Sequence, residues 1–216
     1  MIQGALIRQR ARKRISLMES ILEGIDRFQK NVFPKRREAF EALGGGQQPK
    51  ILLVTCSDSR IDPSMVTQTD PGEIFVVRNA GNLVAPHSAA PSAEAATIEY
   101  GIEALGIPDI VVCGHTHCGA MAALGQPGSA DGLPSVKAWI ETSTASLDRR
   151  DDVSGFEDEL TRLVAANVCQ QLEHLRGHPS VAKGLEAGTL RLHGWVYDFE
   201  RCDVYACDEN GNFSKV

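Results

Sequence analysis

Two short polar motifs in this chain combine residue types that bind metals. Residues 56–60 read Cys-Ser-Asp-Ser-Arg, and residues 115–119 read His-Thr-His-Cys-Gly. Cys56 and Cys118 offer two thiolates, and His115 adds an imidazole three residues before Cys118. A lone cysteine is commonly a small buried hydrophobe, so neither motif is specific alone. Together, two sulfurs and one nitrogen form a suitable ligand set for one Zn²⁺.

Three protein ligands would leave the fourth tetrahedral position of zinc open to water, which is typical of catalytic rather than structural zinc sites. Bound zinc can lower the pKa of such a water to about 7, so that hydroxide becomes available near neutral pH. Because two thiolates donate more charge to the metal than neutral ligands do, we expect the pKa of the water to lie somewhat above that value. The set therefore predicts a zinc-activated nucleophile.

Asp58 and Arg60 lie close to the first ligand and need a separate explanation. Asp58 is two residues from Cys56 and near enough to bind the zinc itself, which would expel the water. Arg60 can hold the carboxylate in a bidentate pair and keep its pKa low, because a nearby cation favours the charged form. Held in this way, Asp58 can accept a hydrogen bond from zinc-bound hydroxide and orient it toward a substrate. We therefore expect Asp58 and Arg60 to form a catalytic dyad.

Short apolar runs predict the strands that position these motifs. Residues 51–54 precede the first motif, residues 110–112 precede the second, and residues 74–77 form a further run. A helical pattern at 91–105 stands between the last two, and buried apolar runs alternating with helices are typical of a parallel sheet covered on both faces. Ligands bind outside the carboxyl ends of strands in such sheets, so two neighbouring strands would bring both motifs to one crevice.

The whole chain fits one α/β domain spanning residues 1–216. Residues 1–40 predict an N-terminal helical arm with an apolar stripe, and residues 134–177 look mostly helical. Strand patterns at 190–197 and 204–206 are separated by a polar turn and can pair antiparallel. The predicted fold class is therefore a mainly parallel central sheet flanked by helices, with an N-terminal helical arm and an antiparallel C-terminal edge.

The arm also carries a basic stretch between Arg8 and Arg14, ahead of its apolar stripe. Two interpretations are open: contact with a membrane surface or a polyanion, or a solvated face on an arm that packs on another subunit. No Trp or Phe accompanies the basic stretch, which favours packing on a partner subunit.

Composition limits the classes of function. The chain has 216 residues, 43% hydrophobic and 23% charged, so a folded domain is expected. A formal net charge of −6 argues against general nucleic-acid binding. No apolar run approaches the roughly 20 residues of a membrane span, and no signal peptide is recognisable, so we expect a cytoplasmic protein. In that reducing compartment, the six cysteines suit metal or catalytic roles better than a disulfide scaffold.

Other histidines and cysteines are weaker candidates. His117 lies between two ligands but would point away from them. His174 and His178 have a spacing that suits a metal, but Gly177 and Pro179 indicate a helix end there, which favours solvated side chains. We expect the remaining cysteines to have packing roles: Cys113 in its strand, Cys169 on the apolar face of its helix, and Cys202 and Cys207 on either side of the predicted strand 204–206.

The two motifs, taken with other segments, make the chain resemble the β-class carbonic anhydrases, in particular their plant and cyanobacterial branch. Besides residues 56–60 and 115–119, the similar segments are 71–73, 78–82, 92–100 and 192–195. The resemblance extends over about residues 15–207, which is nearly the whole chain.

The resemblance implies that Cys56, His115 and Cys118 hold one Zn²⁺ per chain and that the Asp-Arg dyad is catalytic. It also implies that the backbone N–H of Gly119 helps to bind bicarbonate. The family unit is a tight dimer in which the N-terminal helices wrap the partner, and dimers often assemble further. A homodimer or higher homo-oligomer is therefore implied.

Two positions depart from the family pattern. Some bacterial members have an inhibitory bicarbonate site that uses a Trp three residues before the first zinc cysteine. Leu53 stands there in this chain, so that site is not expected, although Arg78 and Tyr197 match its other members. Plant-branch relatives have a substrate-contacting Gln directly before Pro-Gly-Glu, where this chain has Asp70.

The expected function is zinc-dependent, reversible hydration of carbon dioxide to bicarbonate and a proton, by zinc-bound hydroxide that Asp58 orients. The residues alone do not choose the substrate; carbon dioxide is implied by the resemblance. Two alternatives stay open: a carbon disulfide or carbonyl sulfide hydrolase of the same fold, and a non-catalytic scaffold member.

Overall fold

The N-terminal arm is a continuous helical segment. The computed structural model describes residues 17–88, 90 and 92–216, and the chain divides into two compact units after Gly46. In the first unit, residues 17–27 are α-helical and lead into the π-helical turn η1 (Phe28–Val32) and then α2 (Phe33–Leu43). The predicted helix is therefore confirmed from residue 17 onward, whereas the basic stretch between Arg8 and Arg14 lies outside the described residues.

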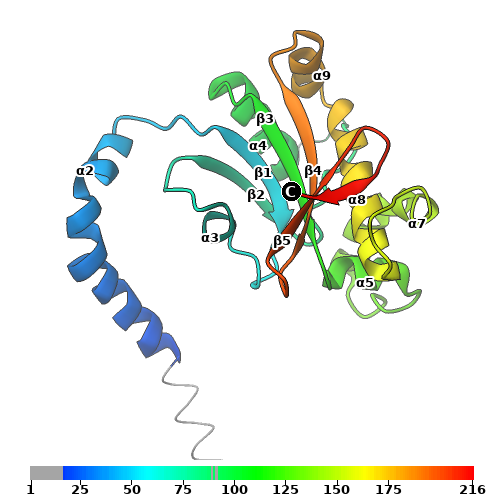
Figure 1. Cartoon of the computed structure of the whole chain (residues 1–216), viewed down its shortest axis with the longest axis horizontal. Coiled ribbons are helices and arrows are strands. Elements are labelled where there is room, and N and C mark those ends of the chain that lie inside the picture. Colours follow the sequence, from blue (N-terminus) through cyan, green and yellow to red (C-terminus); the bar gives the residue numbers. More distant parts are fainter. Residues whose placement is uncertain (1–16, 89, 91) are drawn as a thin grey trace, which may run out of the picture. The chain divides into compact units, whose positions relative to one another are not determined.

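The second unit is built on one mixed sheet (Figure 1). Its strands are β1 (Ile51–Cys56), β2 (Ile74–Asn79), β3 (Asp109–His115), β4 (Arg191–Asp198), β5 (Asp203–Cys207) and β6 (Phe213–Lys215). Within the described residues they follow the order β2-β1-β3-β4-β5-β6. The first four strands pair in parallel, and β5 and β6 pair antiparallel. The predicted parallel sheet with an antiparallel C-terminal edge is confirmed.

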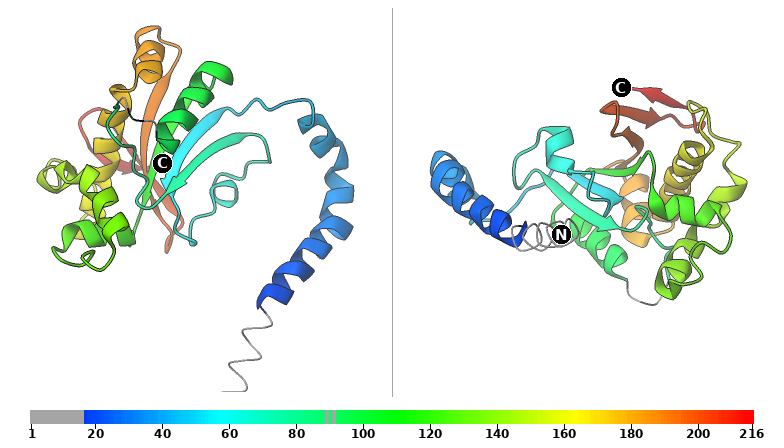
Figure 2. Two further views of the ribbon diagram at one scale, coloured as in Figure 1. Left: turned by 180° about the vertical axis from the view of Figure 1, so that it is seen from behind. Right: turned by 90° about the horizontal axis from the view of Figure 1, so that it is seen from below.

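Helices cover this sheet. They are α3 (Pro63–Thr67), α4 (Ala93–Glu99), η2 (Tyr100–Ala104), α5 (Gly119–Gly125), α6 (Pro134–Ile140), η3 (Glu141–Ser143), α7 (Ala145–Asp148), α8 (Glu159–Arg176) and α9 (Pro179–Glu186). Seen from behind, α4, α8 and α9 lie in front of the strands (Figure 2, left). Their apolar side chains form the main core with Leu52 and Val54 of β1 and Ile110 and Val112 of β3. The intervening side chain of Leu53 joins a second apolar cluster on the opposite face.

Two glycines let α8 lie close to the sheet. A Cβ at Gly114 of β3 would stand 2.7 Å from Val164 Cγ1, and a Cβ at Gly194 of β4 would stand 2.9 Å from Val168 Cγ1. Both distances are shorter than real Cβ contacts, so a side chain at either position would push the helix away. This close packing places α8 directly against β3 and β4.

Several short elements are not predicted by the sequence patterns: α3, α5, α9 and β6. The predicted helix end near Gly177 is confirmed, because α8 stops at Arg176. Pro179, however, also begins α9. In the first turn of a helix the missing N–H of proline costs nothing, because no helical carbonyl would accept from it there.

None of the described helices is long and apolar enough to cross a membrane.

Candidate metal centre

Parallel pairing of β1 and β3 brings the two motifs together. β1 ends at Cys56 and β3 ends at His115, on adjacent strands that run in the same direction. Cys118 follows a tight turn in which His117 has a positive φ of 55°, and it is the N-cap residue of α5. The two sulfur atoms and a ring nitrogen of His115 all lie within 4.8 Å of one another, and all three residues are buried. The three expected ligands therefore form one group.

His115 presents an unpaired nitrogen to this group. Its Nδ1 lies 2.8 Å from the carbonyl oxygen of Thr116. Because a carbonyl can only accept, Nδ1 carries the proton and Nε2 carries a lone pair. His115 is 1% exposed, and its Nε2 has no hydrogen-bond partner among the described residues. A buried polar atom left in this state costs about 1–3 kcal/mol, which coordination to a cation would remove. The donor set and the unpartnered nitrogen both fit Zn²⁺.

The two thiols share a hydrogen bond and differ in acidity. The hydrogen bond from Cys118 lowers the pKa of Cys56, against the opposing effect of burial. The backbone N–H of Gly81 also donates to the Cys56 sulfur, at 3.4 Å. The same Cys56–Cys118 hydrogen bond, together with burial, raises the pKa of Cys118. The protein alone therefore favours one thiolate, and a bound divalent cation favours loss of the second proton.

A charged carboxylate is fixed beside these ligands. Arg60 Nε donates to Asp58 Oδ1 at 2.9 Å, and Arg60 Nη2 donates to Asp58 Oδ2 at 2.7 Å. These hydrogen bonds hold the pKa of Asp58 well below its ordinary value. Asp58 Oδ2 lies 4.0 Å from His115 Nε2. The expected bidentate pair is present, and it keeps an acceptor-only oxygen at the edge of the metal group.

Arg60 is held in turn by the backbone of His117 and by Phe199, which the sequence patterns do not single out. Its guanidinium carbon lies 4.5 Å from the centre of the Phe199 ring, and its Nη2 donates to the carbonyl oxygen of His117 at 3.1 Å. The His117 ring contacts Phe199, and its Nε2 lies 3.0 Å from a carboxylate oxygen of Glu200. Phe199 and Glu200 directly follow β4. Their place at the carboxyl end of a predicted strand is the signal that could have found them.

Arg78 fixes the loop that carries Asp58. Its side chain donates to the carbonyl oxygens of Cys56 at 3.0 Å, Asp58 at 2.9 Å and Ile61 at 3.0 Å. Leu53 and Ile61 line an apolar pocket of about 300 Å³ on the nearby face of the sheet. These contacts give Arg78 a role in holding the loop, whereas Leu53 packs in an apolar cluster that includes Ile61 and Tyr197.

Gly119 and Asp70 occupy different surroundings. Gly119 is the first residue of α5, next to Cys118, and a Cβ there would meet no atom within 4 Å. The protein thus leaves room beside this backbone position. Asp70 is exposed in the turn before β2, where its backbone N–H donates to Glu73 at 2.8 Å.

The expectation that His174 and His178 are solvated is wrong. His178 is 4% exposed, and its Nε2 lies 3.0 Å from the carbonyl oxygen of Ala85. His174 is half-buried, with Nδ1 2.7 Å from the carbonyl oxygen of Val84, and burial lowers its pKa. Both rings satisfy backbone carbonyls of the segment that passes the end of α8, so their role is structural. Cys113 is buried in β3, as predicted, whereas the expectation that Cys202 packs is wrong, because it is exposed in the turn between β4 and β5.

Comparisons with known proteins agree with this geometry. The sequence model of the family described as carbonic anhydrase matches residues 51–204. The carbonic anhydrase of Pseudomonas aeruginosa is 44% identical over 193 residues, which cover 88% of each chain. That of Synechococcus elongatus is 45% identical over 193 residues, covering 87% of this chain and 70% of the relative.

Solved structures give the same result. The β-carbonic anhydrase CcaA superposes with a TM-score of 0.86 at 40% identity, covering 92% of this chain and 99% of that one. A structure of one of two tetrameric β-carbonic anhydrases from Sordaria macrospora has a TM-score of 0.77 at 25% identity. The match covers 88% of this chain and 96% of that one.

The fold and the buried Cys-His-Cys group define an α/β protein with a candidate metal-binding site at the carboxyl ends of two parallel strands. The chain belongs to the carbonic anhydrase family, and within that family to the β class.

Proposed function

We propose that this protein catalyses the reversible hydration of carbon dioxide to bicarbonate and a proton, at one Zn²⁺ held by Cys56, His115 and Cys118. The observation that carries the proposal is the buried, unpartnered Nε2 of His115 beside two thiols, with a fixed carboxylate 4.0 Å away. When bound, Zn²⁺ would act as a Lewis acid that lowers the pKa of a coordinated water far below that of bulk water and so would supply a nucleophile.

Asp58 and Arg60 are the catalytic dyad in this proposal. Asp58 Oδ2 accepts a hydrogen bond from the attacking water and so directs an oxygen lone pair toward the carbon of CO₂. Arg60 donates to both carboxylate oxygens, which keeps Asp58 charged and would oppose binding of the carboxylate to the metal. The backbone N–H of Gly119 helps to bind the bicarbonate product, in the open space next to Cys118.

The substrate separates this proposal from a hydrolase of carbon disulfide or carbonyl sulfide. Both activities would use the same ligand set, so the metal group does not distinguish them. Stopped-flow hydration of CO₂ and sulfide release from CS₂ should be measured on the same zinc-loaded preparation. We expect rapid CO₂ hydration and little sulfide release. Sulfide release without CO₂ hydration would favour the hydrolase, and neither activity at full zinc content would favour a scaffold protein.

We further propose that the protein is a homodimer or a higher homo-oligomer and that the N-terminal arm, residues 1–40, packs on a second copy. The arm carries exposed apolar side chains along one stripe, including Ile21 at 51%, Leu22 at 58% and Ile25 at 49% exposed. A stripe of this kind is usually buried against another surface. The Sordaria macrospora relatives are tetrameric.

Analytical ultracentrifugation tests the assembly. The wild-type chain should sediment as a dimer or larger species, and Ile25→Asp should shift it toward monomer. Glu23→Gln is the matched control, because Glu23 is exposed and pairs only with Arg27 among the contacts of the described arm. A monomeric wild-type chain would contradict this part of the proposal.

We propose a cytoplasmic location. All six cysteines are free thiols, as is usual for proteins of a reducing compartment.

A further inference from the structure

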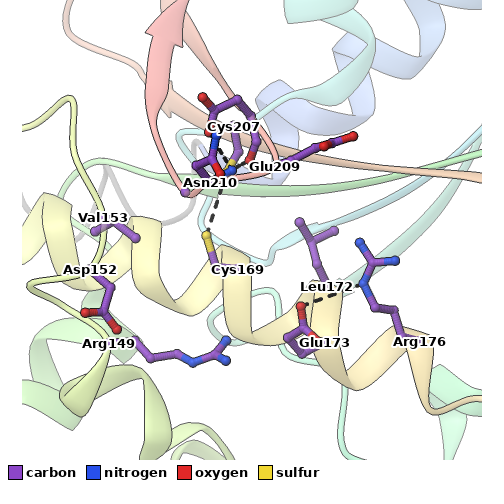
Figure 3. Close-up of a pocket in the computed structure, with 12 residues that line it drawn as sticks. Arg149, Asp152, Val153, Cys169, Leu172, Glu173, Arg176, Cys207, Glu209 and Asn210 are labelled. Carbon is purple, nitrogen blue, oxygen red and sulfur yellow. Dashed lines mark hydrogen bonds and ion pairs between the residues drawn. The ribbon is translucent and has the colours of Figure 1, made fainter.

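A second pair of cysteines lies outside the metal centre. Cys169 Sγ on α8 and Cys207 Sγ at the end of β5 are 3.7 Å apart, although 38 residues separate them in the sequence. Figure 3 shows the two sulfur atoms facing each other across the gap between the helix and the strand. A disulfide needs an S–S distance of about 2.05 Å, so the sulfurs would have to approach by about 1.7 Å. Rotation of two side chains can supply a shift of that size.

Gly194 allows α8 and the Cys207 side chain to come close to each other. A Cβ on Gly194 would stand 2.9 Å from Val168 Cγ1, 3.1 Å from Leu172 Cδ1 and 3.2 Å from Cys207 Cβ. Because this position of β4 has no side chain, α8 and the Cys207 side chain of β5 meet directly above it. Both backbones are held by regular structure on either side, so the two thiols stay close without a large rearrangement.

Solvent and small oxidants can reach the pair. Both cysteines line a pocket of about 280 Å³, which is several times the roughly 30 Å³ that a water molecule occupies. Both are half-buried, whereas Cys56, Cys113 and Cys118 are buried. The pocket also carries the cationic side chains of Arg149 and Arg176.

The two thiols are not equivalent. The hydrogen bond from Cys169 lowers the pKa of Cys207, against the effects of burial and of Asp208. The same hydrogen bond, and then burial, raise the pKa of Cys169. Since the thiolate is the reactive form of cysteine, the lowered pKa favours Cys207 as the sulfur that reacts first, and Cys169 lies 3.7 Å from it.

We propose that Cys169 and Cys207 form a reversible disulfide and that this pair is a site of oxidation by hydroperoxides. In the first step the Cys207 thiolate attacks the terminal peroxide oxygen. An S–O bond forms, the O–O bond breaks, and the alkoxide or hydroxide that leaves takes up a proton. The sulfur loses two electrons to the peroxide and becomes a sulfenic acid. In the second step Cys169 attacks that sulfur, the S–S bond forms, the S–O bond breaks, and the departing hydroxide takes the Cys169 proton as water.

The test uses the full-length, zinc-loaded chain, first reduced and desalted, then treated with hydrogen peroxide at neutral pH. Free thiols are alkylated, and the digested protein is analysed by mass spectrometry. We expect a cross-linked peptide pair joining Cys169 to Cys207, two hydrogen atoms lighter than the sum of its parts and lost on treatment with dithiothreitol. A wild-type chain in which the exposed Cys202 is oxidised while Cys207 remains reduced would overturn the proposal.

Serine variants test the order of the two steps. In Cys169→Ser the sulfenic acid on Cys207 has no resolving thiol, so a dimedone adduct should accumulate there, and the wild-type chain should show none. In Cys207→Ser the Cys169 thiol should stay unmodified. Cys202→Ser is the matched control and should form the cross-link as the wild type does. Equal dimedone labelling of Cys207 in the wild type and in Cys169→Ser would show that no disulfide forms.

Discussion

Two pairs of cysteines meet in this protein, and their surroundings differ. Cys56 and Cys118 are buried and share their space with a histidine nitrogen that has no other partner in the described chain. Cys169 and Cys207 are half-buried at an open pocket whose described lining contains arginines and carboxylates but no histidine. Proximity of two sulfurs therefore does not define a metal site. A third donor favours a cation, whereas access from solvent and a neighbouring thiol favour oxidation.

Replacing one cysteine of each pair should give the largest contrast. Cys56→Ser removes a metal ligand, so zinc should fall from one per chain to nearly none. CO₂ hydration should fall by more than about 100-fold, since loss of an outer-shell partner alone costs about 10–100-fold. Cys169→Ser should retain both zinc and hydration. Elemental analysis and stopped-flow kinetics on the same samples measure the two effects, and loss of zinc from Cys169→Ser would remove the distinction.

Asp58→Asn sharpens the comparison by leaving both thiol pairs intact. The amide lacks the charged acceptor that we assign to orienting the attacking water, so kcat should fall by about 10²–10⁴-fold, the usual contribution of a side chain positioned on a reacting proton. Zinc content should not change.

The matched control for Asp58→Asn is Asp131→Asn, which alters an exposed carboxylate that pairs with Lys137 at 2.7 Å. It should hydrate CO₂ at the wild-type rate. Full activity in Asp58→Asn would contradict the role of the dyad.

The sequence could predict the metal group because residue type and strand position both pointed to it. Cys56 and His115 stand at the ends of apolar runs, and parallel strands end at one edge of a sheet. The residue type of Phe199 did not point to a role in the same way. Its role depends on contact with the Arg60 guanidinium, and Arg60 follows a different strand, β1. The Cys169–Cys207 pair depends on Gly194, a residue with no chemistry of its own. Short helices such as α5 and α9 have too few turns to show a clear period.

Phe199→Leu should have a smaller effect than loss of the carboxylate. The ring contacts the Arg60 guanidinium, and an exposed cation–π contact contributes about 0.5–1 kcal/mol. Arg60 would hold Asp58 less firmly, so kcat should fall by about two- to fivefold with zinc retained. Phe156→Leu, which changes a ring that contacts Tyr205 and Phe213 instead, should leave kcat unchanged. Equal losses in the two variants would indicate a general packing effect.

The smallest expected effect is at the opposite end of β3 from His115. Hydrogen bonds from Arg191, and then from His193, lower the pKa of Asp109 to about 2. A folded-state pKa below the unfolded value means that the carboxylate stabilises the fold above about pH 4 and that this contribution is lost as the pH falls toward 2. Because Arg191 is exposed, solvent screening limits the contribution to about 1 kcal/mol.

Urea unfolding at several pH values measures this contribution. Asp109→Asn should be less stable than the wild type by about 1 kcal/mol at pH 7, and the difference should shrink below pH 4. Zinc content at pH 7 and the Cys169–Cys207 cross-link should be unaffected, which would separate global stability from both thiol sites. A difference that stays constant with pH would contradict the assignment.

Metal removal tests the central claim most directly. The purified protein is treated with a zinc chelator at neutral pH, and zinc content and CO₂ hydration are measured on the same samples, before and after Zn²⁺ is restored. We expect one zinc per chain at the start, a hydration rate that falls in proportion to zinc content, and recovery when zinc returns. Full CO₂ hydration by protein that has lost nearly all its zinc would contradict it.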